Sequence, residues 1–187
     1  MSENVILIAG PMGAGKTTAI KSLSETEVVS TEAQNTEQNV VDKPTTTVAL
    51  DYGEICLGDE DKIKMYGVPG QKRFDFMWRI LEKRALGLIV LINNDSEDPI
   101  GEAKYFLDQF SSIHHRGGVV IGITRSDLKE GPTVDEYHKK LSQDGKYLDL
   151  PVFTVDPRDK EHMITMLYSL LMNIESNQGD LDDLLVS

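Results

Sequence analysis

The residues with the clearest chemical pattern lie near the N-terminus, between Gly10 and Thr17. They read Gly-Pro-Met-Gly-Ala-Gly-Lys-Thr and fit G-x-x-x-x-G-K-[ST], a loop whose backbone N–H groups surround an anionic phosphate. Lys16 can reach the outer phosphates of a nucleotide, and the Thr17 hydroxyl is a suitable ligand for Mg2+. The pattern predicts a phosphate-binding loop (P-loop) whose contact residues are Gly10, Gly13, Ala14, Gly15, Lys16, Thr17 and Thr18.

The flanks of this loop supply the elements that the pattern requires. The apolar run from Val5 to Ala9 indicates a short buried strand, and a helix is expected from about Lys16 to Ser24. The start of that helix adds the positive end of its dipole to the loop. A plain strand–helix turn containing a lysine is the structural alternative, and the joint fit of pattern and flanks disfavours it.

The rest of the chain alternates strands with helices. The polar segment Ser30–Thr47 is expected to be a long loop, followed by an antiparallel hairpin with strands at Thr47–Leu57 and Lys62–Tyr66. Further strands are expected at Leu86–Ile92, Val119–Ile123 and Pro151–Val155. Apolar residues at helical spacing mark helices around residues 76–81, 103–110, 134–141 and 163–174. This order predicts an α/β fold: three α-β-α layers, a mostly parallel six-stranded sheet with one antiparallel strand, and about five helices.

Composition and charge narrow the classes of function. The 187 residues include 19 Lys and Arg against 31 Asp and Glu, a formal net charge of -12. Such a surface disfavours general binding to nucleic acids and anionic membranes, whereas a local site built from amides and one lysine can still hold phosphate. The single cysteine, Cys56, excludes an intramolecular disulfide and suits a cytoplasmic location. It lies in a predicted strand and is expected in the core.

No sequence pattern predicts that the chain is attached to a membrane. No stretch approaches the ~20 apolar residues of a membrane span, and no signal or lipid-attachment pattern is present, so no constitutive membrane anchor is expected. Residues 1–175 are predicted to form one domain. Residues 176–187 are acidic and are predicted to be a flexible tail, with a short partner-binding peptide as the alternative.

The order of the motifs resembles that of Ras-like small GTPases over roughly Val5–Glu175. Residues 45–53 (Thr-Thr-Thr-Val-Ala-Leu-Asp-Tyr-Gly) and 67–74 (Gly-Val-Pro-Gly-Gln-Lys-Arg-Phe) resemble the prokaryotic small GTPases of the MglA type. The resemblance implies a P-loop NTPase fold and a molecular switch that binds GTP or GDP with Mg2+. Two loops, switch I and switch II, would rearrange when the γ-phosphate leaves.

The resemblance assigns roles to residues in both switch loops. Thr47 is the candidate for the switch I ligand of Mg2+ because it abuts the following strand, with the adjacent Thr45 and Thr46 as alternatives. In switch II, Gly70 is expected to donate its N–H to the γ-phosphate, and Gln71 is expected to orient the attacking water.

One position in switch II departs from the family pattern. Gly67 stands where the family has the acid of D-x-x-G, so the carboxylate that supports the metal from the outer shell is missing. Asp51, four residues past Thr47 on the neighbouring predicted strand, is a candidate to replace it.

A third motif concerns the base of the nucleotide. Thr124-Arg125-Ser126-Asp127 resembles the base-recognition motif N-K-x-D. An ionised Asp127 only accepts hydrogen bonds, so it favours guanine, which presents two adjacent donors, over adenine, which presents an acceptor. The stem of Arg125 is expected to stack on the base, and Thr124 in place of Asn weakens one contact. Asp156 and Pro157 lie where the family has its second base-binding loop, so the expected guanine-binding set is Thr124, Arg125, Asp127, Asp156 and Pro157.

These residues together predict a switch that hydrolyses GTP, with Lys16 and Gln71 as the catalytic residues. Neither Arg73 nor Arg79 can be assigned as a catalytic arginine, so intrinsic hydrolysis is expected to be slow and to need another protein. The resemblance suggests a GTPase-activating protein or exchange factor of the Roadblock or longin type, besides an effector. The alternatives are a nucleotide-binding module with negligible turnover and a P-loop kinase, which would leave Gln71 and Asp127 unexplained.

Overall fold

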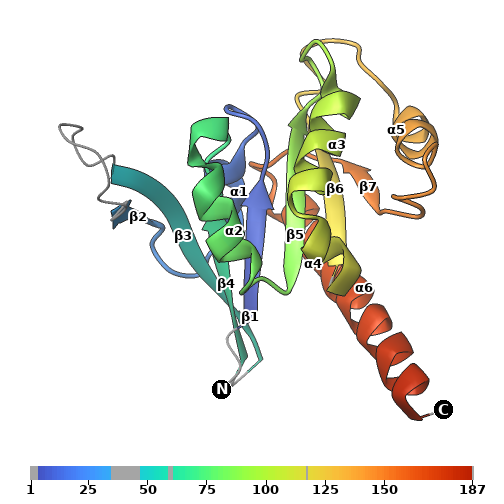
Figure 1. Cartoon of the computed structure of the whole chain (residues 1–187). Coiled ribbons are helices and arrows are strands. Elements are labelled where there is room, and N and C mark those ends of the chain that lie inside the picture. Colours follow the sequence, from blue (N-terminus) through green and yellow to red (C-terminus); the bar gives the residue numbers. More distant parts are fainter. Residues whose placement is uncertain (1–3, 35–46, 59–60, 117, 187) are drawn as a thin grey trace, which may run out of the picture.

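The computed structural model describes the backbone of residues 4–34, 47–58, 61–116 and 118–186, and the side chains of residues 4–29, 50–58, 61–115 and 118–178. Strands and helices alternate over most of this length (Figure 1). In chain order the elements are β1 (Asn4–Ala9), α1 (Lys16–Leu23), β2 (Val29–Gln34), β3 (Thr47–Leu57), β4 (Asp61–Gly67), the 3-10 turn η1 (Lys72–Phe74), α2 (Asp75–Glu82), β5 (Gly87–Asn93), α3 (Pro99–Gln109), α4 (Ser111–Arg116), β6 (Gly118–Thr124), α5 (Val134–Leu141), β7 (Val152–Thr154) and α6 (Lys160–Val186).

The strands form one mixed sheet in the order β2-β3-β4-β1-β5-β6-β7. Strand β3 pairs antiparallel with both of its neighbours, β2 and β4, whereas β1, β4, β5, β6 and β7 pair in parallel. Every residue of β5 and β6 is buried, as expected for parallel strands covered on both faces. The predicted α/β class, with its single antiparallel strand, is therefore confirmed.

The sheet has one strand more than the six expected, because part of the predicted polar loop is strand β2. Residues 29–34 pair along β3 from Val29 opposite Tyr52 to Gln34 opposite Thr47. An edge strand is stabilised mainly by its backbone ladder with the neighbouring strand, so it does not need the apolar run by which the other strands were recognised. The remainder of the predicted loop, residues 35–46, lies outside the described residues.

Helices cover both faces of the sheet. Helices α2, α3, α4 and α5 pack on one face around Trp78, Phe106, Phe110 and Tyr137. Helices α1 and α6 pack on the other face around Ile20 and the methionines and leucines of α6. Figure 1 shows α2, α3 and α4 in front of the sheet and α6 behind it. The three layers leave the carboxyl ends of the parallel strands open at one edge, where ligands of such sheets bind.

Two local predictions differ from the structure. The segment predicted as a flexible tail continues helix α6 to Val186, and Leu181 and Leu185 extend the helical spacing of Leu170 and Ile174 along the chain. Cys56, expected in the core, is exposed, because it lies on the outward face of β3 between the inward-facing Ile55 and the half-buried Leu57. Within the described part of the chain, no helix combines the length and apolar character needed to cross a membrane.

Candidate nucleotide-binding site

The P-loop connects the carboxyl end of β1 to the first residue of α1. The Lys16 Nζ atom donates hydrogen bonds to the carbonyl oxygens of Gly10, at 2.9 Å, and Pro11, at 2.7 Å. Burial lowers the pKa of Lys16 to about 8, and the nearby charge of Asp51 opposes part of this shift. The lysine is thus tied to the start of its own loop in a place where a bound anion would favour its charged form.

Thr17, in the first turn of α1, contacts Asp51 on β3. The Thr17 hydroxyl donates a short hydrogen bond to Asp51 Oδ2. Asp51 faces Gly67 across the β3–β4 ladder, and a Cβ on Gly67 would lie 3.3 Å from Asp51 Cβ and 3.7 Å from Asp51 Oδ2. The Asp51 side chain therefore occupies space that a side chain at position 67 would need. The Asp51 carboxylate thus contacts the hydroxyl that is predicted to bind Mg2+.

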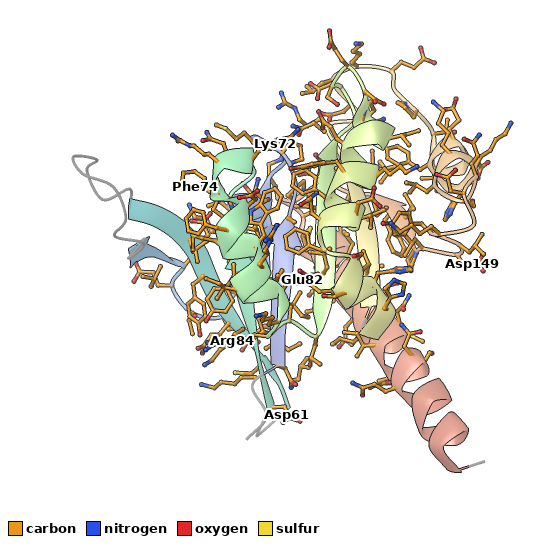
Figure 2. All side chains as sticks on the ribbon, viewed as in Figure 1. Asp61, Lys72, Phe74, Glu82, Arg84 and Asp149 are labelled. Carbon is orange, nitrogen blue, oxygen red and sulfur yellow. The ribbon has the colours of Figure 1, made fainter. Side chains whose placement is uncertain are left out.

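The segment predicted to be switch II lies against the P-loop. A Cβ on Gly70 would lie 2.6 Å from the carbonyl oxygen of Gly10, so the two backbones are in close contact. The Gln71 side chain lies beside Met12, with Nε2 3.0 Å from the sulfur atom. Figure 2 shows Lys72 and Phe74, which belong to η1, at the upper end of α2, whereas Arg84 and Asp61 lie toward the opposite end of the sheet. The two predicted switch II residues are thus close to the phosphate-binding loop.

A cavity of about 510 Å³ opens beside the P-loop. Its walls come from the P-loop, from the loop after β6 and from the loop after β7. They include nine residues predicted to bind phosphate or base: Gly13, Ala14, Gly15, Thr18, Thr124, Arg125, Asp127, Asp156 and Pro157. A volume of this size suits a small organic ligand, and the residues predicted to bind the base share the cavity with part of the predicted phosphate-binding loop.

Arg125 has an unusual backbone in the loop after β6. Its φ of 60° lies in the left-handed region, which residues other than glycine adopt at a cost of about 1–3 kcal/mol unless the surroundings hold them there. Its Nε atom pairs with Asp95 Oδ2 at 3.4 Å, and its Nη1 atom lies 3.6 Å from the position of a Cβ on Gly13. The guanidinium group therefore lies between the loop after β5 and the P-loop.

The loop after β7 is held by its own charges and by helix α1. Arg158 donates from Nε and Nη2 to both carboxylate oxygens of Asp156, at 2.8–3.2 Å, and these bonds lower the pKa of Asp156 to about 2. The Ser22 hydroxyl donates to the Pro157 carbonyl at 2.5 Å. A Cβ on Gly15, whose φ is +94°, would lie 2.6 Å from Pro157 Cγ, so this loop packs directly against the P-loop.

The structure brings the predicted site residues into two groups. The cavity gathers the base-binding set and part of the P-loop, while Lys16, Thr17, Gly70 and Gln71 lie around the other side of that loop with Asp51. Thr47 begins β3, but its side chain lies outside the described part, as do Thr45 and Thr46 entirely. Among the described residues, no cluster of three or more His, Cys, Asp or Glu side chains could hold a metal ion, so a metal here would depend on hydroxyl and phosphate oxygens as well.

Sequence reasoning missed two kinds of residue here. Arg158 and His162 line the cavity, and Met12 contacts Gln71. Arg158 follows directly after the predicted Asp156-Pro157 pair, so the placement of that loop could have indicated it. Neither the contact of Met12 with a residue far along the chain nor the return of α6 to the pocket at His162 leaves a local pattern in the sequence.

The strand order of the sheet and the P-loop after β1 are those of a P-loop NTPase fold. The chain belongs to the family of conserved hypothetical ATP-binding proteins, whose profile matches residues 24–177. The match begins at the end of α1, after the P-loop, and covers the switch II and base-side segments. This chain is therefore in the class of nucleotide-binding P-loop proteins.

Two curated proteins are also similar in sequence. One is "ADP-ribosylation factor-like protein 9" from Homo sapiens, 25% identical over 138 residues, which are 73% of this chain and 66% of that protein. The other is "Uncharacterized protein MJ1339" from Methanocaldococcus jannaschii, 32% identical over 90 residues, 48% of this chain and 51% of that protein. The chain thus matches less than two thirds of the length of each relative.

Proposed function

We propose that this protein is a guanine-nucleotide switch that binds GTP or GDP with Mg2+ and slowly hydrolyses GTP to GDP and phosphate. The observation that carries the proposal is the cavity of about 510 Å³, whose walls include residues of the P-loop and of the loop that carries Asp127. The similarity to an ADP-ribosylation factor-like protein supports the same class of function.

Asp127 supports the choice of guanine. Its carboxylate is exposed at the cavity, and its charge raises the pKa of Arg158, after the larger effect of the bonds to Asp156. A carboxylate accepts hydrogen bonds and donates none, so it pairs with the adjacent donors of guanine and opposes the ring nitrogen of adenine. The description of the family names ATP, which makes the choice of base the first property to measure.

The residues around Thr17 fit a magnesium ion. Mg2+ prefers hard oxygen ligands and keeps several waters, and the Thr17 hydroxyl lies beside the carboxylate of Asp51. We assign Thr17 and Thr47 as ligands and Asp51 as the carboxylate that orients a metal-bound water, in the role that an acid at position 67 would otherwise have. The bound ion would neutralise charge on the phosphates.

The remaining residues are assigned roles in the hydrolysis of GTP. Gln71 orients the attacking water, whose oxygen forms a bond to the γ-phosphorus as the bond to the β-phosphate oxygen breaks. Lys16 stabilises the negative charge that collects on the phosphates. Arg73 and Arg79 are exposed on switch II and serve as contacts for a partner, so we assign no catalytic arginine within the described chain.

A regulator is part of this proposal. An arginine supplied by another protein accelerates comparable reactions about 10³- to 10⁵-fold. The resemblance of residues 45–53 and 67–74 to the MglA type suggests a GTPase-activating protein or exchange factor of the Roadblock or longin type. Switch II offers such a partner the exposed Ile80 beside Arg79. We also propose a cytoplasmic location, which suits a chain whose sequence has a single cysteine, Cys56.

The test is nucleotide binding by calorimetry, with GTP, GDP and ATP, for the wild type, Asp127→Ala and the control Asp135→Ala. The control removes an exposed carboxylate of α5, outside the cavity, so it makes the same change in net charge. We expect the wild type and control to prefer guanine nucleotides and Asp127→Ala to lose that preference. Equal affinity of the wild type for both bases would contradict the proposal.

A binding module with negligible turnover is the second candidate. The contact between Gln71 Nε2 and Met12 Sδ favours it, because it engages the amide that would orient the water. Single-turnover hydrolysis with Mg2+ separates the two candidates. Release of phosphate from bound GTP supports the switch, and retention of intact GTP over many hours supports the binding module.

A further inference from the structure

Three polar side chains are buried where β5 and β6 end, and two of them, Asn93 and Asn94, have no role in the proposed function so far. They are Asn93, 8% exposed, Asn94, 5% exposed, and Thr124, 1% exposed. Asn93 and Thr124 are partners in the parallel register of β5 and β6. A buried amide is costly unless its hydrogen bonds are made, so the partners of Asn93 indicate what its position requires.

Asn93 contacts the P-loop on one side and the base loop on the other. Its Nδ2 atom donates to the carbonyl oxygen of Met12 at 3.2 Å, and its Oδ1 atom lies 3.5 Å from the Thr124 hydroxyl. That hydroxyl also lies 3.2 Å from the carbonyl oxygen of Ile92. The carbonyl of Met12 only accepts, so the amide of Asn93 must face it with nitrogen, which leaves its oxygen toward Thr124.

The bond to Met12 controls the direction of a P-loop amide. A trans peptide is planar, so the C=O of Met12 and the N–H of Gly13 point in opposite directions. Holding the carbonyl toward Asn93 therefore turns the Gly13 N–H away from β5. Gly13 has a φ of +77°, so this peptide needs a glycine, and its orientation is not fixed by a regular helix or strand.

We propose that Asn93 is a positioning residue that couples the phosphate end of the site to the base end. Its hydrogen bond to Met12 aims the Gly13 amide at the phosphates, and its contact with Thr124 ties that peptide to the loop that carries Asp127. The proposal rests on the proposed function, because it concerns the same nucleotide site. The Asn93 side chain is 8% exposed, so its hydrogen bond to Met12 is stronger than it would be in water, and the contact with Thr124 adds to it.

The adjacent Asn94 provides a matched control. It is equally buried, and its Nδ2 atom also donates to a backbone carbonyl at 3.2 Å, but that carbonyl belongs to Pro132. Its Oδ1 atom accepts from the Tyr137 hydroxyl at 3.1 Å. Asn94→Ala therefore removes the same chemical group, but its hydrogen bonds go to α5 and to the α5 end of the loop after β6, and none goes to the P-loop.

The experiment measures the dissociation rate of ribose-labelled fluorescent GDP from the wild type, Asn93→Ala and Asn94→Ala, with thermal unfolding of each. We expect Asn93→Ala to release GDP about tenfold faster, the effect of losing roughly one buried hydrogen bond in the bound state. Asn94→Ala should stay within about twofold of the wild type at a similar loss of thermal stability. Asn93→Asp, of nearly the same shape but without the donor, should also release GDP faster and serves if Asn93→Ala does not fold.

The outcomes separate this inference from the proposed function. Release from Asn93→Ala at the wild-type rate, or equal acceleration in Asn94→Ala, would overturn the positioning role alone. A wild type that binds neither labelled GDP nor labelled ADP would overturn both. A wild type that prefers ADP would overturn the choice of guanine, and the same variants compared with labelled ADP would then decide the role of Asn93.

Discussion

At the phosphate end of the site, the partly buried Lys16 donates to two carbonyls of its own loop, whereas at the base end Arg125 and Arg158 are exposed and paired with carboxylates. A charge in a poorly solvated place responds strongly to any partner, while exposed pairs are screened by water and contribute little. From this comparison we expect affinity for a nucleotide to originate mainly at the predicted phosphate end. We expect the predicted base end to decide which nucleotide binds.

The largest effect should follow from removing the charge at the phosphate end. Lys16→Ala eliminates a partly buried ammonium that faces the phosphates, and we expect affinity for GTP to fall about 100-fold or more. Calorimetry with GTP measures the change, and Lys21→Ala on the exposed side of α1 is the control. An affinity that stays within a few-fold of the wild type would mean that the base end carries the binding.

The next effect concerns the carboxylate beside Thr17. Asp51→Ala should weaken Mg2+ binding to the nucleotide complex about 10- to 100-fold, the usual effect of losing an outer-shell partner. Since Asp51 fills the space next to Gly67, the double variant Asp51→Ala/Gly67→Asp should recover part of the loss. Mg2+ titration of the GDP complex, with circular dichroism to verify folding, provides the measurement. Unchanged Mg2+ affinity in Asp51→Ala would remove Asp51 from the metal site.

The pH dependence of GTP binding is a second test of Lys16 at the predicted phosphate end. The pKa of Lys16 is lowered to about 8 in the free protein, and phosphate favours the charged lysine, so binding should be strongest below that pH. Above about pH 8 the affinity for GTP should fall, approaching tenfold per pH unit. Lys16→Arg stays charged over this range, so its affinity should be nearly flat between about pH 7.5 and about 9.5. Parallel profiles in both proteins would exclude Lys16 as the titrating group.

The lowered pKa of Lys16 also makes the stability of the folded protein depend on pH, in the direction opposite to that of binding. The folded pKa of Lys16 lies below the ordinary value of 10.5, so the unfolded chain binds more protons between about pH 8 and 10.5. This lysine therefore makes the nucleotide-free protein more stable as pH rises through that window, while it makes binding weaker.

The smallest effect is expected at the base end. Arg158→Ala removes an exposed partner of Asp156, and affinity for GDP should change by no more than about threefold. The pKa of Asp156, now about 2, should rise toward the ordinary range near 3.8, which carboxyl NMR titration can follow. In the wild type, the stability linked to this pKa is present above about pH 4 and is lost as pH falls toward 2. A loss of affinity as large as that of Lys16→Ala would reverse the comparison between the two ends.

Much of the fold could be predicted because its signals are local. Buried parallel strands such as β5 and β6 appear as unbroken apolar runs, and the P-loop is eight consecutive residues. Strand β2 could not be predicted, because its polar sequence is held by pairing with a neighbouring strand. The helical spacing does continue after residue 175, but the acidic composition of that segment favoured the prediction of a tail. Cys56 was misplaced because both faces of a hairpin strand carry apolar residues here.

The sequence alone determined that a P-loop lies between a buried strand and a helix, and that an acid, Asp127, follows the next-to-last strand of the sheet. Only the tertiary structure decided that Asp51 fills the space beside Gly67 and that Asn93 contacts the P-loop and Thr124. The physical reason is that the backbone of a loop such as the P-loop depends mainly on residues adjacent in sequence. Contacts between strand ends depend on register and burial, which arise when the sheet assembles.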